Sequence, residues 1–338
     1  MSKAISLRSG QAGPEDAGSD RRARRDWPLA CGLAGGVIAD AMAGDPERGH
    51  PVAVFGQIMA ALEHRVYADR ATAGFAYAAG GVILGAAPVF VAARLTRAHP
   101  AGRTAITTAT AWAAIASRSL SEAARQIETA LGTSDLPGAR ELLPCLCGRD
   151  PQGLDFAGIT RAVVESVAEN TSDAIVAPLI WGALAGPAGL SGYRAVNTLD
   201  AMVGHRSPRY ERFGRASARL DDVANWIPAR ATALLAAACS PAVRGRPRPT
   251  WQIARDYGRY HPSPNAGWCE AAFAGALGVR LGGVLSYSGR IEHRPEIGRG
   301  RPPQAGDITR AIRLSRAVTA SATALAVAVA AAGSSGHR

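Results

Sequence analysis

Three acidic residues at helical spacing begin the stretch around which this chain is organised. Glu165, Glu169 and Asp173 are four residues apart in turn, so a helix that carries them places them on one face. Three carboxylates on one stripe repel one another unless cations neutralise them, which implies Mg²⁺ or nearby arginines. A solvated acidic face is the alternative, but the stripe leads directly into an apolar segment rather than into solvent.

Two more polar stretches lie beyond that apolar segment. The first runs from Arg194 to Arg206 and the second from Arg219 to Trp226. Arginine binds phosphate through paired N–H groups, and Mg²⁺ takes oxygen ligands, carboxylates among them. Groups that can hold metal or phosphate therefore stand at both ends of a segment apolar enough to enter a bilayer. This arrangement is typical of a membrane enzyme whose site lies at the interface.

Two loops add further polar groups. In residues 40–56 prolines break the helix and glycines supply turn freedom, and the loop brings together Asp40, Asp45, Glu47 and His50. A solvated turn and a cation or phosphate site fit that loop equally well. In the second loop, Asn265 is expected to cap the small-residue helix that follows, leaving backbone N–H groups for an anion.

The elements that must position these groups are apolar helices. No residue between Arg70 and Arg94 is charged, which is long enough for a membrane-spanning helix. Residues 317–336 form a second candidate. The run from Trp27 to Ala39 is short unless Asp40 joins it, and residues 104–117 suit a buried or interfacial helix. The segment 174–193 could span, but its many Pro and Gly residues also suit a kinked or re-entrant segment.

The remaining segments indicate helical loops. Residues 118–164 are predicted to be a soluble helical insert, and the Arg-rich stretches 194–230 and 244–316 are expected on the cytoplasmic side. We therefore predict an all-α, polytopic integral membrane protein with helical cytoplasmic loops. Residues 1–26 are predicted to be a disordered basic extension, followed by one membrane domain over 27–338. The number of spans and their orientation stay open.

Composition supports this fold class. Of the 338 residues, 47% are hydrophobic and only 19% are charged, below the roughly 25% of soluble domains. The net charge of +11 suits anionic lipid, phosphorylated substrates or nucleic acid. Because no nucleic-acid-binding motif accompanies the charge, no nucleic-acid partner is expected.

Taken together and in order, these motifs resemble the CobD/CbiB family of cobalamin-biosynthesis proteins, the adenosylcobinamide-phosphate synthases. The resemblance covers roughly residues 27–335. It rests on Gly44-Asp45-Pro46 with His50-Pro51-Val52, Glu165-Ser166 through Glu169-Asn170-Thr171-Ser172-Asp173, Tyr193-Arg194 through Asn197-Thr198-Leu199-Asp200, Gly204-His205, Arg219-Leu220-Asp221-Asp222, and Ser263-Pro264-Asn265-Ala266-Gly267-Trp268.

The resemblance implies a multi-pass inner-membrane enzyme. Such an enzyme attaches (R)-1-amino-2-propanol, or its O-phosphate, to the peripheral propionate of adenosylcobyric acid, with ATP as co-substrate and Mg²⁺. The carboxylate must be activated, most simply as an acyl phosphate, and the amine must lose a proton before it attacks. Phosphoryl transfer needs mainly positioning and charge neutralisation. Membrane lipid is an expected partner, and association with other corrinoid-pathway enzymes stays open.

On that basis we assign hypothetical roles to the polar residues. The predicted catalytic residues are Glu165, Glu169 and Asp173, on Mg²⁺ or the amine, with His50 or His205 as the base. The predicted substrate- and phosphate-binding residues are Asn170, Arg194, Asn197, Arg206, Arg219, Asn265 and Trp268. The predicted metal ligands are Asp45, Asp200, Asp221 and Asp222.

Two other classes of function are compatible with the sequence. A membrane carrier for a corrinoid would line a translocation path with the polar stretches. A non-catalytic sensor that resembles the AmpE-type membrane proteins would not need every acidic and Asn motif intact. Whether the amine arrives phosphorylated is not decided by the sequence.

Overall fold

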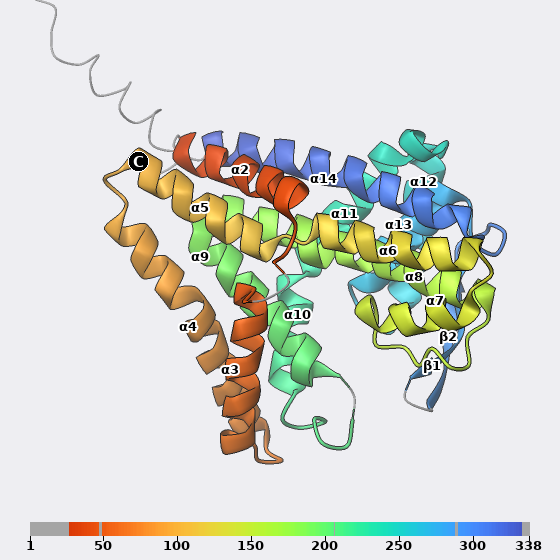
Figure 1. Cartoon of the computed structure of the whole chain (residues 1–338), viewed down its shortest axis with the longest axis horizontal. Helices are drawn as coiled ribbons and strands as arrows, with labels where there is room; N and C mark the ends of the chain where they lie inside the picture. The colour runs from red at the N-terminus through yellow and green to blue at the C-terminus, as the bar shows by residue number, and fades with distance from the viewer. Residues whose placement is uncertain (1–26, 47–48, 206, 288–289, 333–338) are drawn as a thin grey trace, which may run out of the picture.

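The computed structural model describes residues 27–46, 49–205, 207–287 and 290–332, and the predicted extension over residues 1–26 lies outside these ranges. The described chain is mostly helical, as expected (Figure 1). Its helices are α2 (Trp27–Ala43), α3 (Pro51–Val66), α4 (Ala71–Leu95), α5 (Pro100–Ala114), α6 (Ser117–Gly132), α7 (Leu136–Leu142), α8 (Phe156–Thr171), α9 (Ala177–Leu199), α10 (Arg215–Ala224), α11 (Trp226–Cys239), α12 (Pro247–Tyr257), α13 (Ala266–Leu277) and α14 (Gly306–Ala332).

Helices α2 and α5 lie against each other, and α14 runs along α2 (Figure 1). Their close approach depends on small residues. A Cβ added at Gly32 would collide with Thr107, and one at Gly36 would collide with Ala111. Glycine at a helix interface lets backbones approach closely, which is how helices commonly pack in membranes. α2 continues past the predicted run to Ala43 and takes Asp40 into the helix.

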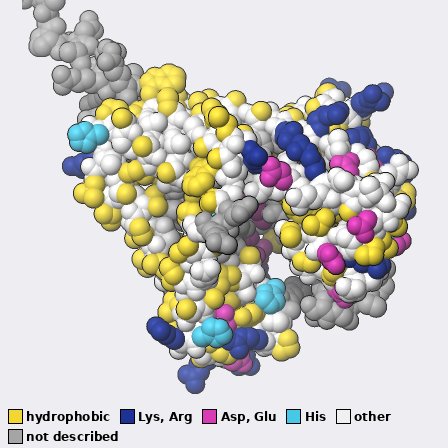
Figure 2. All heavy atoms as spheres, in the orientation of Figure 1, with side chains coloured by type: hydrophobic (Ala, Val, Ile, Leu, Met, Phe, Trp, Pro, Cys, Tyr) yellow, Lys and Arg dark blue, Asp and Glu magenta, His cyan; other side chains and the backbone are white. Residues whose placement is uncertain are grey.

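Three stretches of the described chain are long and apolar enough to cross a bilayer: Ala71–Leu95, Phe156–Gly204 and Gly306–Ala332. The first and third contain most of the two spans that the sequence indicated. α4 exposes large apolar side chains, with Phe75 69% and Leu95 77% exposed. Apolar side chains gather over the end of the molecule that holds α4 and α5, whereas arginines gather at the opposite end, around α12 (Figure 2). Such a division suits a protein that is embedded in lipid at one end.

The second of these stretches is not a single rod. Gly186 has φ +67°, outside helical geometry, and the chain reverses there. A Cβ at Gly189 would collide with the Trp181 carbonyl, and one at Gly182 would lie 2.8 Å from Leu190 Cγ. The two limbs of α9 therefore fold back on each other as a helical hairpin. This confirms the predicted kinked form of the segment, which brings residues near 173 and near 200 together.

Pro178 explains how the α9 hairpin joins α8. Residues 172–176 form a π-helical turn, in which Ala177 N–H donates to Ser172 O. Proline has no N–H, so Pro178 offers no partner to the carbonyls one turn before it. The Ala174 carbonyl instead accepts from Ala116 N–H at 3.2 Å, at the junction of α5 and α6. π-Helical turns of this kind occur frequently at functional sites.

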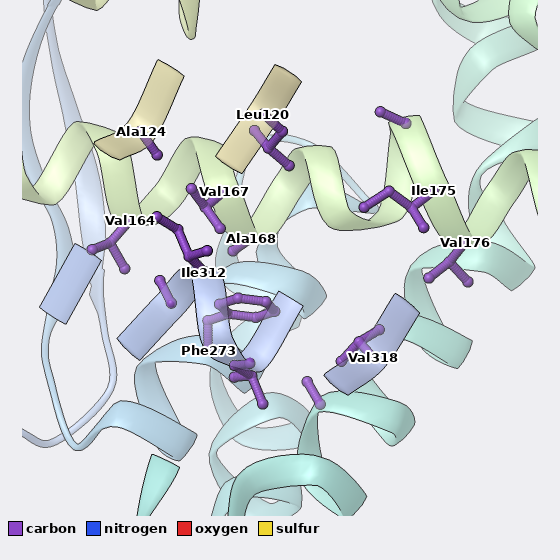
Figure 3. Close-up of a cluster of buried hydrophobic side chains, with 14 of the residues drawn as sticks. Leu120, Ala124, Val164, Val167, Ala168, Ile175, Val176, Phe273, Ile312 and Val318 are labelled. Atoms are coloured by element: carbon purple, nitrogen blue, oxygen red, sulfur yellow. The ribbon is translucent and has the colours of Figure 1, made fainter. Parts of the chain in front are cut away.

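The main core surrounds α8. Side chains of Val167 and Ala168 lie between Leu120 of α6 on one side and Phe273 of α13 and Ile312 of α14 on the other (Figure 3). All five belong to one buried cluster, which includes Val164 and Ile175 further along the same helical path. α8 is thus held from several sides, and its polar residues are fixed in position by this packing.

One element departs from the all-α prediction. β1 (Leu281–Tyr287) and β2 (Arg290–Ile297) form a two-stranded antiparallel sheet in which Gly283 is opposite Arg294. The sheet is anchored to α8, because Gly282 N–H donates to Glu165 Oε1 at 2.6 Å. An isolated hairpin is marginally stable in water, so this attachment to the helical core is what fixes its position.

Candidate active site

Carboxylates from three separated segments lie near the open end of the α9 hairpin. The charges of Glu169, Asp200 and Asp221 all act on Asp173. The charges of Asp221, Asp222 and Glu169 act on Asp200. We call these five residues, Glu169, Asp173, Asp200, Asp221 and Asp222, the acidic cluster. The reversal at Gly186 brings Asp173 and Asp200 together, and α10, which packs on α9, adds the Asp221–Asp222 pair.

Asp221 has the most fully described surroundings of the five. Its Oδ2 accepts from Asn225 Nδ2 at 3.0 Å, and its Oδ1 is 3.5 Å from Asn197 Nδ2. Burial, with a smaller contribution from the charges of Asp222 and Glu169, raises the pKa of Asp221 to about 6, and the amides of Asn225 and Asn197 limit that rise. Asn197, predicted to bind substrate, therefore supports a carboxylate of the cluster. Its own Oδ1 accepts from Arg194 at 3.2 Å.

Arg194 connects the acidic cluster to the loop after α2. The charges of both Asp45 and Asp173 act on it. Asp45 Oδ2 accepts from the Ser119 hydroxyl at 2.6 Å, and its Oδ1 is 3.5 Å from His50 Nε2. The Nδ1 of His50 accepts from Val52 N–H at 3.3 Å, which makes it the N-cap of α3. Since its Nε2 is buried, His50 is poorly placed to take a proton from a substrate.

A large polar recess lies beside the cluster. Its volume is about 1020 Å³, and its lining includes His205, Arg215, Arg219, Asp222, Arg259 and His261. This size is at the upper end of ordinary ligand pockets, about 300–1,000 Å³. Figure 2 shows a hollow between the arm of α3, α4 and α10 and the unit that holds α7, with acidic side chains visible in it.

His205 and Arg219 are the predicted residues with the most open surroundings. His205 is exposed, and its ring meets the ring of Tyr210 edge-on at 4.9 Å. The Arg219 side chain is 73% exposed and lies 3.8 Å from Asp222. Both can therefore contact a molecule in the recess. Arg206, a predicted phosphate-binding residue, lies outside the described residues.

Glu165 does not fit its predicted catalytic role. Its Oε2 is paired with Arg149 and its Oε1 accepts from Gly282 N–H. The Glu165 and Arg149 side chains are only 2% and 5% exposed. Both oxygens are thus committed inside the protein, so we correct the prediction and treat Glu165 as a structural anchor for the β-hairpin. Glu169, one turn later, is exposed.

Sequence reasoning missed a second group of polar residues, which lies near Glu165 and Glu169. His261 and Glu270 are both buried, with Nε2 and Oε1 3.7 Å apart. Arg294 Nη1 lies 3.0 Å from the same His261 nitrogen. Burial, and then the charge of Arg294, lower the pKa of His261 to about 4, which keeps this ring neutral near pH 7. Burial raises the pKa of Glu270 well above its usual range, and the charges of Glu165 and Glu169 add to that effect.

One signal in the sequence pointed to Glu270. It is the only charged residue between Gly267 and Val279, and an isolated acid in an apolar helix needs a partner. No comparable signal in the sequence pointed to His261. The structure explains the nearby glycine, because a Cβ on Gly267 would collide with the Cβ of His261.

Asn265 and Trp268 brace the site rather than face the recess. Asn265 Nδ2 donates to the Asp222 carbonyl at 2.8 Å, and its Oδ1 accepts from Arg230 at 2.8 Å. The Arg230 guanidinium lies 5.1 Å from the Trp268 ring centre. The predicted cap is also wrong, because it is Ser263 Oγ that accepts from Ala266 N–H, at 3.1 Å. Asn265 instead ties α13 to α10.

The remaining predicted binding residue, Asn170, is half-buried. Its Nδ2 donates to the Ser166 carbonyl at 3.0 Å and lies 3.1 Å from the Ser166 hydroxyl. The amide therefore folds back on its own helix, one turn before it. The acidic cluster lies just beyond, at Asp173.

Of the predicted Mg²⁺ ligands, Asp200, Asp221 and Asp222 act on one another through their charges, without forming a closed cage. Asp45 instead contacts Ser119 and His50, outside the acidic cluster. In the described part of the chain, no three Asp, Glu, His or Cys side chains are grouped closely enough to hold an ion on their own. The donors nevertheless fit Mg²⁺ chemically, because they are carboxylate oxygens whose like charges act on one another. Mg²⁺ usually takes only one or two carboxylates and completes its shell with water and substrate phosphates. A closed cage is therefore not required.

Comparison with known proteins gives consistent matches. The family model described as CobD/Cbib protein matches residues 33–315. The cobalamin biosynthesis protein CobD of Mycobacterium tuberculosis H37Rv is 51% identical over 296 residues, which is 87% of this chain and 93% of that protein. The protein of the same description from Stutzerimonas stutzeri is 41% identical over 285 residues, 83% of this chain and 91% of the relative. No solved structure matches the chain.

Proposed function

Because the chain belongs to the CobD/CbiB family of cobalamin-biosynthesis proteins, we propose that it is an ATP-dependent amide-forming ligase. The proposed substrates are adenosylcobyric acid and (R)-1-amino-2-propanol or its O-phosphate. The product is adenosylcobinamide or its phosphate, formed at the peripheral propionate of the corrin. ATP would be the co-substrate and Mg²⁺ the metal.

One observation carries the proposal. Carboxylates from residues 169–173, 200 and 221–222 gather beside a recess of about 1020 Å³ that also presents Arg215, Arg219 and Arg259. Acids that hold a hydrated cation, next to arginines that hold phosphate, are the groups that phosphoryl transfer needs. The recess is also large enough to admit a bulky substrate.

The chemistry has two balanced steps. A propionate oxygen attacks the terminal phosphorus of ATP, forming an acyl phosphate and releasing ADP. The amine nitrogen then attacks the acyl carbon, the phosphate leaves with the bond electrons, and the amine proton passes to a base. Without the first step, attack on the carboxylate would have to expel oxide.

We assign the steps to residues by what each side chain can reach. Arg219, exposed at the recess, would hold phosphate oxygens of the nucleotide or of the phosphorylated amine. His205, exposed and not buried like His50, is the better candidate for the base, since its ring can reach a substrate in the recess. Glu169, also exposed, would attract the ammonium form of the amine.

Asp221, with one of Asp173 and Asp200, would hold Mg²⁺, and water and substrate phosphates would complete its shell. When bound, the ion supplies positive charge that neutralises the phosphate oxygens during transfer. The amides of Asn197 and Asn225 orient Asp221. The brace through Asn265 holds the backbone of α10 beside it.

We further propose that the protein is a multi-pass protein of the inner membrane. Three described stretches are long and apolar enough to span, and α4 exposes side chains that suit lipid. The Arg-rich loops would lie on the cytoplasmic side by the positive-inside tendency, where ATP is available. The site would then open to the cytoplasm next to the bilayer.

The carrier alternative is supported less well. A translocation path needs polar side chains along apolar helices, but the α9 hairpin carries no charged residue between Ala174 and Tyr193. The polar groups gather instead at the open end of that hairpin. A non-catalytic sensor would have no need for several acids gathered beside one recess.

Purified full-length protein in lipid nanodiscs provides the test. Adenosylcobyric acid, ATP, Mg²⁺ and each amine separately are supplied, and the corrinoid products are identified by mass spectrometry with ADP release measured in parallel. The proposal predicts one new amide product per ADP, with a preference for one of the two amines. Corrinoid binding without product for either amine would favour the carrier or sensor.

A further inference from the structure

A continuous hydrogen-bond relay reaches Asp221 from the second limb of α9. The Tyr193 hydroxyl donates to Asn225 Oδ1 at 2.8 Å, and Asn225 Nδ2 donates to Asp221 Oδ2 at 3.0 Å. Tyr193 is 3% exposed and Asn225 is 1% exposed. Neither residue belongs to the set that sequence reasoning assigned to the site. Both are buried polar groups whose hydrogen bonds end on a carboxylate of the acidic cluster.

The carboxylate of Asp221 sets the direction of the hydrogen bonds in the relay. An Asn side chain can present either its oxygen or its NH₂ group to a neighbour. A carboxylate accepts hydrogen bonds and does not donate them, so Asn225 must turn its NH₂ group toward Asp221. The Tyr193 hydroxyl, by donating to the amide oxygen, stabilises that orientation and disfavours the reversed one.

Tyr193 is itself fixed by the π-helical turn. Its hydroxyl also lies 3.2 Å from the Asp173 carbonyl. In this turn the partner of that carbonyl five residues on would be Pro178, which has no N–H, and Ala177 N–H is already used by Ser172 O. The Asp173 carbonyl is therefore open to the Tyr193 hydroxyl. The single hydroxyl proton is thus shared between the Asp173 carbonyl and the amide oxygen of Asn225, whose NH₂ group orients Asp221.

We propose that Tyr193 and Asn225 are positioning residues, which hold the Asp221 carboxylate in the orientation needed to bind the cation of the acidic cluster. This inference rests on the proposed function, because it takes Asp221 to be a metal ligand. Groups that hydrogen-bond to metal ligands commonly contribute about 10–100-fold to metal affinity. The relay would contribute in that range, without touching the metal or the substrate.

Direct Mn²⁺ binding tests the relay without requiring turnover. The free Mn²⁺ signal is measured by electron paramagnetic resonance for the full-length protein in nanodiscs, for wild type, Y193F, D221N and the double variant Y193F/D221N. We expect Y193F to weaken Mn²⁺ binding about 10-fold or more. If Tyr193 acts only through Asp221, the double variant will bind no more weakly than D221N alone.

Tyr77→Phe is a matched control. Tyr77 is also buried, 2% exposed, and its hydroxyl donates to the Met59 carbonyl at 3.3 Å. It lies in a second core, which joins α3 and α4 to Leu199 and Val203 and contains neither Tyr193 nor Asn225. We expect Y77F to bind Mn²⁺ within twofold of wild type. Equal losses in Y77F and Y193F would overturn the proposal, because they would reflect a general loss of structure.

Asn225→Leu keeps the test decisive if Y193F folds poorly. It removes both hydrogen bonds of the relay at similar side-chain volume, and we expect the same loss of Mn²⁺ affinity. Wild-type affinity in N225L, or a Y193F effect that adds fully to that of D221N, would overturn the inference. Amide formation measured separately keeps the two claims distinct. If Y193F weakens Mn²⁺ binding but the wild-type protein forms no amide product, the role of the relay is supported and the proposed ligase function is rejected.

Discussion

Replacing Glu165 by alanine separates a structural role from a catalytic one at the acidic stripe of α8. In the structure, Glu165 pairs with Arg149 and accepts from Gly282 N–H, and Glu169, one turn later, is exposed. Glu165→Ala would leave the guanidinium of Arg149 without this partner in a site where it is 5% exposed. It would also leave the Gly282 N–H without its acceptor and release the β-hairpin from α8.

The size of the effect follows from burial. Solvent screens a pair this deeply buried very little, and breaking such a pair by removing one partner costs about 3–5 kcal/mol. That is a large part of the roughly 5–15 kcal/mol by which proteins are stable. Glu165→Gln keeps an oxygen for Gly282 and loses the charge, so a smaller loss is expected. The apolar pair R149M/E165L should recover only part of the lost stability. It removes the buried charge of Arg149, but it leaves Gly282 N–H without its acceptor and takes away a positive charge that acts on Glu169 and Glu270.

The assay is thermal unfolding in nanodiscs together with proteolysis at the β-hairpin. We expect E165A to unfold at a clearly lower temperature and to be cut faster between residues 281 and 297. The matched variant E169A should keep the wild-type unfolding temperature and lose turnover. Wild-type stability in E165A, with turnover lost, would refute the structural role and return Glu165 to the catalytic set.

Three further predictions concern pH, the α9 hairpin and the recess. The pKa of Asp221, raised to about 6 by burial, exceeds about 3.9 in the unfolded chain, so between these values the unfolded state binds fewer protons and stability falls as pH rises. D221N should make that fall shallower in metal-free denaturation curves from pH 4 to 7 and stabilise the protein at pH 7 by on the order of 2 kcal/mol. Part of the fall should remain, because burial also raises the pKa of Glu270; an unchanged slope would contradict the prediction. G186A should cost about 1–3 kcal/mol from backbone strain alone, because φ +67° with ψ −160° is a conformation that essentially only glycine adopts and no atom lies within 4 Å of the added Cβ. G189A, which collides with the Trp181 carbonyl, should cost more, and the reverse order in thermal unfolding would argue against the hairpin. R219Q should raise the KM for ATP or for the phosphorylated amine about tenfold, the loss of one hydrogen bond to a charged group, with unfolding temperature unchanged; an unaltered KM for both would remove Arg219 from the recess chemistry.

The sequence was sufficient for the features that depend on local pattern. The uncharged run after Arg70 became α4, and the breakers between residues 174 and 193 marked a kinked segment. The spacing of Glu165, Glu169 and Asp173 did indicate a helical acidic stripe. These features follow from residue period and composition, which act over one or two helical turns.

The β-hairpin and the fate of Glu165 depend on contacts between distant segments. Glu165 meets Gly282 only in the folded chain, so its helical spacing with Glu169 could not separate a structural acid from an exposed one. The hairpin had one local signal, the dipeptide Ser288-Gly289 between its strands, of a kind that marks turns. A turn dipeptide alone is weak evidence for a β-hairpin, because the Arg-rich residues that follow it show no strong alternation of apolar and polar side chains.

The braces of the site were also beyond local reasoning. Asn265 looked like a helix cap, a role that its neighbour Ser263 fills. Tyr193 stood inside a quoted motif and Asn225 inside the polar stretch from Arg219 to Trp226. Their importance lies in the hydrogen bond between them, which joins α9 to the junction of α10 and α11. Asn and Tyr side chains serve many structural purposes, so only their partners reveal which one applies.

The central claim is that carboxylates from three separated segments surround one cation site, and iron-directed cleavage measures this most directly. Fe²⁺ replaces Mg²⁺ in the purified protein, ascorbate and peroxide generate radicals at the bound ion, and the cut sites are mapped by mass spectrometry. The account predicts cuts near Asp173, Asp200 and Asp221 together, all suppressed in parallel by excess Mg²⁺. Cuts near only one of these segments, or suppression of one without the others, would contradict it.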